Sequence, residues 1–151
     1  TRRGVSAWLI LQKDLGGHTS DVPHWDIQTK FFDGENIARL EFITAITALR
    51  EWKQKYQVRD KKYKITLFID CEAIKNLLGR RDRLEKTNYQ SQTKKRPLAN
   101  ADLYKEFLTL YDEILFEIIW LKGHSPKGTQ TPFQKIFSQV DKFGRKTLRE
   151  L

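Results

Sequence analysis

Two apolar runs constrain the fold of this chain more than any other feature. Ile65–Ile69 (ITLFI) is apolar apart from one threonine, and Phe116–Leu121 (FEIIWL) is interrupted by a single glutamate. Short runs of this kind are typical of strands that are buried on both faces of a sheet. The sequence therefore predicts an α/β layer with both hairpin and crossover connections.

The first part of the chain is predicted to form a hairpin followed by a helix. Val5–Leu11 and Asp26–Phe32 are β-prone segments, and the Gly16–Gly17 pair between them marks a break. We expect these two strands to pair antiparallel. From Asn36 to Tyr56, apolar residues recur every three or four positions, which is the period of an amphipathic helix.

Three more helices are predicted in the rest of the chain. Glu72–Leu78 is expected to form a short helix that ends at Gly79. Asp102–Leu115 carries a helical stripe of apolar residues, with Asn100 as its N-cap. The last helix begins at Thr131–Pro132, where a capping residue precedes a proline at the first helical position. The predicted order is two strands, a helix, a strand, two helices, a strand and a helix.

Size and composition predict a single domain over residues 1–151, because 151 residues of which 39% are hydrophobic suffice for one core. No run of about 18 apolar residues is present to span a bilayer, and the first residues lack the layout of a signal peptide. Cys71 is the only cysteine, which excludes an intrachain disulfide and a cysteine-based zinc site. We expect a cytoplasmic protein with no membrane partner.

The net charge of +9 favours polyanionic partners such as nucleic acids or anionic membranes. Gly79–Pro97, predicted to be a loop, holds seven basic residues against Asp82 and Glu85, a net charge of +5. A second basic stretch, Lys53–Lys64, is assigned a role in solubility, and a charge run is most often simply a solvated face. The seven candidate nucleic-acid-binding residues are Arg80, Arg81, Arg83, Lys86, Lys94, Lys95 and Arg96.

Three carboxylates occupy positions where chemistry is expected. Glu41 lies in the first turns of its helix, and Asp70 directly follows a buried strand, where α/β sheets present catalytic groups. Asp141 lies beside the apolar stripe of the last helix. An isolated carboxylate at such a place is unfavourable unless it is paired, protonated or bound to metal. Ordinary roles stay open for each: an ion pair with Arg39 or Arg50 for Glu41, a helix cap for Asp70, and an ion pair with Lys142 or Arg145 for Asp141.

Together, several segments resemble the motifs of the type 1 ribonuclease H family, in the family's order. The resemblance runs from about Gly4 to Leu151. Ile37–Phe42 (IARLEF) resembles the family's helix with its catalytic Glu, and Ile65–Cys71 (ITLFIDC) resembles the strand that ends in Asp. Asp102–Tyr104 resembles the start of the helix before the last strand, and Trp120–His124 (WLKGH) resembles that strand with the histidine loop. Gln139–Asp141 with Arg145–Lys146 resembles the terminal helix.

The resemblance implies a ribonuclease H-like mixed sheet flanked by helices, and an enzyme that hydrolyses the RNA strand of RNA/DNA hybrids. It implies that Glu41, Asp70 and Asp141 converge at one end of the sheet to hold two Mg²⁺ ions, with Mn²⁺ as the alternative. Such hard cations prefer oxygen ligands, and a metal pair stabilises the attacking and leaving oxygens. His124 is expected to assist proton transfer or product release, and the basic segment to act as the family's substrate-binding handle.

The sequence departs from the family pattern in three respects. The stretch from His124 to Asp141 is longer than the family usually has. The family's first strand, with its additional Asp, has no counterpart here, and we expect it upstream of Thr1. The family handle is rich in tryptophan, whereas Gly79–Pro97 has none. Two other functions therefore stay open: a catalytically silent module of the same fold that binds nucleic acid or protein, and, ranked lower, a different nuclease or a transposase of this fold.

Overall fold

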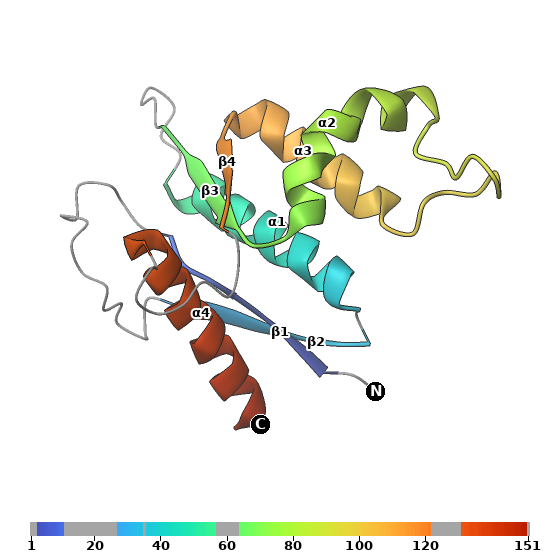
Figure 1. The fold of residues 1–151 in the computed structure, drawn as a ribbon. Coiled ribbons are helices and arrows are strands. Elements are labelled where there is room, and N and C mark those ends of the chain that lie inside the picture. The colour runs from blue at the N-terminus through green and yellow to red at the C-terminus, as the bar shows by residue number, and fades with distance from the viewer. Residues whose placement is uncertain (1–2, 11–26, 35, 57–63, 122–130, 151) are drawn as a thin grey trace. The chain divides into compact units, whose positions relative to one another are not determined.

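The computed structural model describes residues 3–10, 27–34, 36–56, 64–121 and 131–150, and its elements follow the predicted order (Figure 1). The elements are β1 (Arg3–Trp8), β2 (Gln28–Asp33), α1 (Ile37–Lys55), β3 (Thr66–Ile69), α2 (Glu72–Lys86), α3 (Ala101–Ile114), β4 (Glu117–Trp120) and α4 (Pro132–Arg149).

The chain divides into two compact units. The first contains Thr1–Ala48 and Lys122–Leu151, and the second contains Leu49–Leu121. Helix α1 thus contributes most of its length to the first unit and its last turns to the second. Among the residues that the structure describes, each unit has a two-stranded sheet, β1 with β2 in the first and β3 with β4 in the second.

In the first unit, β1 and β2 form the predicted antiparallel pair, with Val5 opposite Phe31. Helix α4 packs on β1, and Gly144 permits the contact, because a Cβ added there would lie 2.9 Å from the Ala7 Cβ. A hydrogen bond of 2.6 Å between the hydroxyls of Thr44 and Ser6 joins α1 to the same strand. Helices α1 and α4 therefore both contact β1.

The start of α4 confirms the prediction from Thr131 and Pro132. Thr131 is the N-cap, and its hydroxyl accepts a hydrogen bond of 3.2 Å from the backbone N–H of Gln134. In return, the Gln134 side chain accepts a bond of 2.8 Å from the Thr131 N–H. This reciprocal capping box satisfies two N–H groups that have no partner within the helix.

In the second unit, β3 and β4 run parallel, with Ile69 opposite Trp120. The core beside them contains Phe107 of α3, whose ring meets Phe116 edge to face at a centroid distance of 5.6 Å. The expectation that β3 is buried on both faces was too strong, since only Ile69 of its residues is buried. Within the described residues β3 pairs with β4, so its other edge has no strand beside it there.

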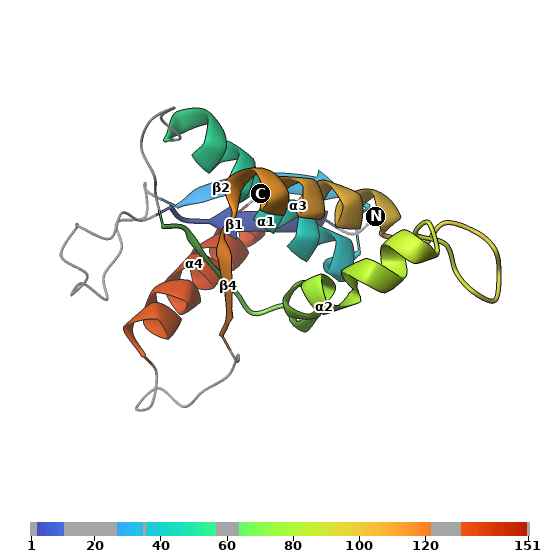
Figure 2. The same cartoon turned by 90° about the horizontal axis from the view of Figure 1, so that it is seen from above.

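The expected end of α2 at Gly79 was wrong, because the helix continues to Lys86. Glycine inside a helix costs only about 1 kcal/mol relative to alanine, and the residues after Gly79 are good helix formers. Leu84 is buried and extends the apolar face beyond the glycine. The helix ends at Lys86 with Thr87 as its C-cap, and a loop leads from there to α3 (Figure 2). Within this loop, Gln90 and Pro97 form an isolated β-bridge.

Candidate functional site

Asp70 lies in the second unit, at the junction between β3 and α2, where its side chain is exposed. The strand ends at Ile69, and Cys71 takes the N-cap position of α2. The N–H of Lys75 donates the first backbone hydrogen bond of the helix to the Cys71 carbonyl oxygen, at 3.2 Å. The junction therefore presents the Asp70 carboxylate to solvent at the carboxyl end of the strand, as the sequence predicts.

Two groups hold this junction, one on the last residue of β4 and one on the residue that follows it. The N–H of Leu121 donates to the Ile69 carbonyl at 2.6 Å, and the indole N–H of Trp120 donates to the Asp70 carbonyl at 3.2 Å. The Nζ of Lys75, in the first turns of α2, lies 4.2 Å from the centroid of the same indole ring. Sequence reasoning gave Trp120 and Lys75 no role, because their contacts with the Asp70 junction follow only from the register of β3 and β4.

The other two candidate carboxylates lie in the first unit. Glu41 is half-buried on α1, and Asp141 is exposed on α4. Asp141 makes the ion pair that sequence analysis left open, with an oxygen 2.9 Å from Arg145 one turn further along α4. An exposed pair of this kind contributes little to stability. Convergence of Glu41 and Asp141 with Asp70 stays a prediction.

The chemistry of these donors suits a hard divalent cation, because all three predicted ligands present carboxylate oxygens. Within the described ranges, the structure gathers no group of three or more His, Cys, Asp or Glu side chains that could hold a metal ion. His124 lies outside the described residues.

The seven basic candidates do not form a single loop, which corrects the prediction for Gly79–Pro97. Four of them lie on the second half of α2, and three lie in the segment between α2 and α3. Six side chains are exposed, and Arg81 is half-buried. On α2, Arg80, Arg83 and Lys86 are spaced by three residues and extend over about 9 Å of helix. A helix therefore carries the larger part of the predicted handle.

Arg81 differs from its neighbours because all three nitrogens of its guanidinium donate hydrogen bonds to acidic side chains. It forms a bidentate pair with Asp112 of α3, with distances of 2.7 and 2.6 Å, and its Nε donates to Glu85 at 2.8 Å. The hydrogen bonds to Asp112 and then to Glu85 raise the pKa of Arg81, and those from Arg81 hold the pKa of Asp112 below its usual value. Arg81 thus attaches α2 to α3.

Tyr89, in the same basic segment, is buried with 8% of its surface exposed. Its backbone lies in the left-handed region at φ 57°, and its N–H donates to the Leu84 carbonyl at 2.8 Å. Burial raises the pKa of the Tyr89 hydroxyl. Tyr89 thus packs in the turn that ends α2.

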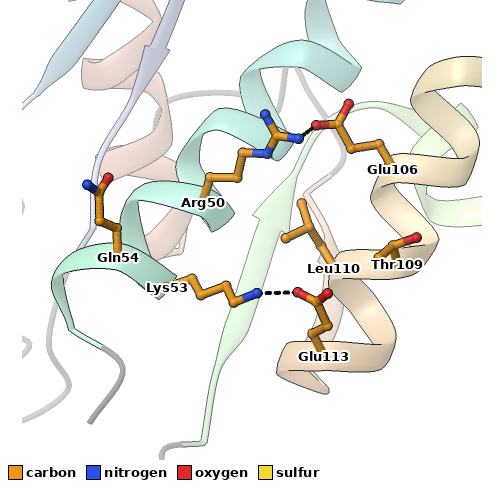
Figure 3. Close-up of a pocket in the computed structure, with 7 residues that line it drawn as sticks. All are labelled: Arg50, Lys53, Gln54, Glu106, Thr109, Leu110 and Glu113. Carbon is orange, nitrogen blue, oxygen red and sulfur yellow. Dashed lines mark hydrogen bonds and ion pairs between the residues drawn. The ribbon is translucent and has the colours of Figure 1, made fainter.

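A pocket in the second unit lies between the last turns of α1 and α3 (Figure 3). Two ion pairs cross it, Arg50 with Glu106 and Lys53 with Glu113. Lys53 belongs to the second basic stretch, whose residues 57–63 lie outside the described part of the chain. The pairing of Lys53 with an acidic side chain agrees with a structural role for that residue.

The sequence matches the family model described as RNase H over residues 3–146, a range that includes described segments of both units. This chain belongs to the RNase H family. Among solved structures it is similar to one described as "Solution structure of PFV RNase H domain", at 11% identity and a TM-score of 0.62, with 95% of this chain and 91% of that chain covered. At this identity the likeness shows the fold alone, which confirms the expected RNase H-like α/β class. No curated protein matches the chain.

Membership of the RNase H family connects the described features with nuclease-like function on nucleic acids. The helices that the structure describes include none with the length and apolarity needed to cross a bilayer.

Proposed function

We propose that this protein is a metal-dependent endonuclease that hydrolyses the RNA strand of RNA/DNA hybrids. The observation that carries the proposal is the position of Asp70 within an RNase H family match, exposed at the end of β3 and followed directly by the basic helix α2. A candidate catalytic carboxylate and a candidate phosphate-binding surface thus belong to one unit.

Glu41, Asp70 and Asp141 would hold the metal, Mg²⁺ or alternatively Mn²⁺. When bound, the metal supplies Lewis-acid stabilisation of the phosphodiester oxygens and lowers the pKa of a water molecule. The protein supplies negative charge at Asp70 on a backbone that is fixed from β4. His124 would move a proton at the leaving oxygen or assist product release.

The exposed bases of α2 would bind the phosphates of the hybrid. Arg80, Arg83 and Lys86 lie on a helix that Arg81 attaches to α3, so their side chains start from a fixed backbone. Contacts to phosphates and 2′-hydroxyls recognise the A-form shape of a duplex rather than its sequence. We therefore expect little sequence preference.

A panel of labelled substrates tests this function on the full-length natural protein. The protein should cut the RNA strand of a hybrid when Mg²⁺ or Mn²⁺ is supplied, leave a 3′-hydroxyl, and cut neither the DNA strand nor duplex DNA. The same reactions with a chelator in place of metal should show no cleavage. Equal cutting of duplex DNA, or cutting in chelator, would contradict the proposal.

The alternative is a catalytically silent module that binds nucleic acid, and the ion pair between Asp141 and Arg145 favours it because that carboxylate already has a cation. The same panel separates the two functions. A full-length protein that binds the hybrid yet leaves it uncut at saturating metal would support the silent module.

A further inference from the structure

The indole of Trp120 contacts both elements that flank Asp70. Its N–H donates to the Asp70 carbonyl at 3.2 Å, and its ring lies under the Nζ of Lys75 at 4.2 Å. Trp120 is the last residue of β4, directly opposite Ile69, the last residue of β3. The Trp120 side chain therefore extends beyond the last paired residues of β3 and β4 to the carbonyl of Asp70.

The Asp70 carbonyl lies between two backbone carbonyls that already have backbone partners. The Ile69 carbonyl accepts the N–H of Leu121, and the Cys71 carbonyl accepts the N–H of Lys75. The Asp70 carbonyl falls between the sheet ladder and the helix, and the indole donates to it there. Because a carbonyl held in place restricts the ψ angle of its own residue, this bond restrains the direction in which the Asp70 Cα presents its side chain.

Lys75 connects the same indole to α2. An ammonium over the face of a tryptophan is attracted by the ring quadrupole, and tryptophan is the most favourable aromatic residue for this contact. Lys75 lies one turn beyond Cys71, so the ring is bound to the start of α2 as well as to the end of β3. Both elements that meet at Asp70 are thereby attached to one rigid side chain.

We propose that Trp120, with Lys75 over its ring, is a positioning residue that sets the orientation of the Asp70 carboxylate for metal binding. The inference rests on the proposed function, because it assigns Asp70 a metal. Residues that orient a metal ligand typically change metal affinity by 10- to 100-fold when they are replaced. Neither Trp120 nor Lys75 needs to touch the substrate for this effect.

Trp120→Phe in the full-length natural protein removes the indole N–H and retains an aromatic ring for Lys75. The Mg²⁺ concentration at half-saturation, measured by calorimetric titration without substrate, should rise about tenfold, whereas the KM for the hybrid should stay unchanged. Trp52→Phe makes the same chemical change on α1 and should leave the Mg²⁺ titration unaltered.

Lys75→Met tests the contact between the Lys75 ammonium and the indole ring. We expect this variant to raise the Mg²⁺ concentration at half-saturation by less than Trp120→Phe does. The double variant should show less than the sum of the two effects, because both substitutions act through one ring. In wild type, the indole NMR signal that disappears in Trp120→Phe should shift during the Mg²⁺ titration, a readout that requires no catalysis.

The outcomes are distinguishable. If Trp120→Phe melts at a lower temperature but binds Mg²⁺ with wild-type affinity, Trp120 is only structural and the inference is overturned while the proposed function stands. If the wild-type protein neither binds Mg²⁺ nor cuts the hybrid, the proposed function fails and the inference fails with it.

Discussion

Arg81 belongs to a group of seven bases in the sequence, but its contacts separate it from the other six. Both of its terminal nitrogens face the carboxylate of Asp112, and its Nε faces Glu85. Sequence spacing shows the Glu85 contact, since the two residues are four apart on one helix, but Asp112 lies 31 positions away. Charge counting therefore identifies the basic region but not the contact between Arg81 and Asp112.

The pair between Arg81 and Asp112 predicts an acid-sensitive contribution to stability. Because the folded pKa of Asp112 is depressed, the native state binds fewer protons than the unfolded chain between the two pKa values. The contribution is complete above the unfolded pKa of about 3.9 and is lost as the pH falls through the folded pKa. Asp112→Asn should flatten the dependence of the unfolding free energy on pH in that range.

Urea denaturation of wild type and Asp112→Asn at a series of acid pH values measures this difference. Arg81→Gln should flatten the same pH window, because it removes the partner that lowers the pKa of Asp112. Identical pH dependence in all three proteins would show that the pair does not persist in solution.

The exposed bases of α2 are predicted to bind phosphate, in contrast to the second basic stretch. Arg80→Glu, Arg83→Glu and Lys86→Glu together should weaken hybrid binding and reduce its salt slope by roughly one for each lost phosphate contact. Fluorescence anisotropy at several salt concentrations gives both quantities.

The matched control reverses Lys55, Lys61 and Lys62, which changes the net charge of the protein by the same amount. Affinity and salt slope should then stay near those of wild type. Equal losses in the two triple variants would show that only net charge matters and would remove the assignment of α2 as the handle.

At the scale of elements, helix and strand type followed from periodicity, whereas the end of α2 did not. The N-cap and proline at Thr131–Pro132 located the start of α4 correctly, because capping is local chemistry. Gly79 was given too much weight as a terminator, although the buried residues Leu77 and Leu84 lie seven apart, on one face of a continuous helix. That spacing was the available signal for the longer α2.

Gly79→Ala should stabilise the protein by about 0.5–1 kcal/mol, because alanine loses less backbone entropy in a helix and a Cβ at this site meets no atom within 4 Å. Thermal melting should show a higher midpoint. Gly144→Ala is the control, and it should lower the midpoint, since its Cβ would lie 2.9 Å from the Ala7 Cβ. A lower midpoint for Gly79→Ala would contradict the continuous helix.

At the scale of the whole molecule, the sequence sufficed for the order of elements and the family, because these depend on local patterns and on motifs along the chain. It did not reveal the contacts of Trp120 with the Asp70 junction, because strand register depends on packing between distant segments. The joining of Glu41, Asp70 and Asp141 in one site also depends on tertiary structure, and it stays a prediction.

Paramagnetic broadening tests that prediction directly. Mn²⁺ added to the full-length protein should broaden backbone amide signals beside Glu41, Asp70 and Asp141 at the same low metal concentration, because all three ligands would surround one site. Signals of Thr87, about 20 Å from Asp70 at the other end of α2, serve as a reference. Broadening at Asp70 alone would mean that the three carboxylates do not converge.

The proposed function depends most on Asp70, and substitution of this residue by asparagine tests it most directly. Asp70→Asn nearly preserves volume but removes the charge on which metal binding depends. We expect Asp70→Asn to lose Mg²⁺-dependent cleavage of the hybrid and to keep hybrid binding through α2. In metal-free buffer this variant should melt at or above the wild-type temperature. The control is Asp82→Asn, an exposed change on α2. An Asp70→Asn protein that melts lower and still cuts the hybrid would show that Asp70 is a structural residue and would contradict the central claim.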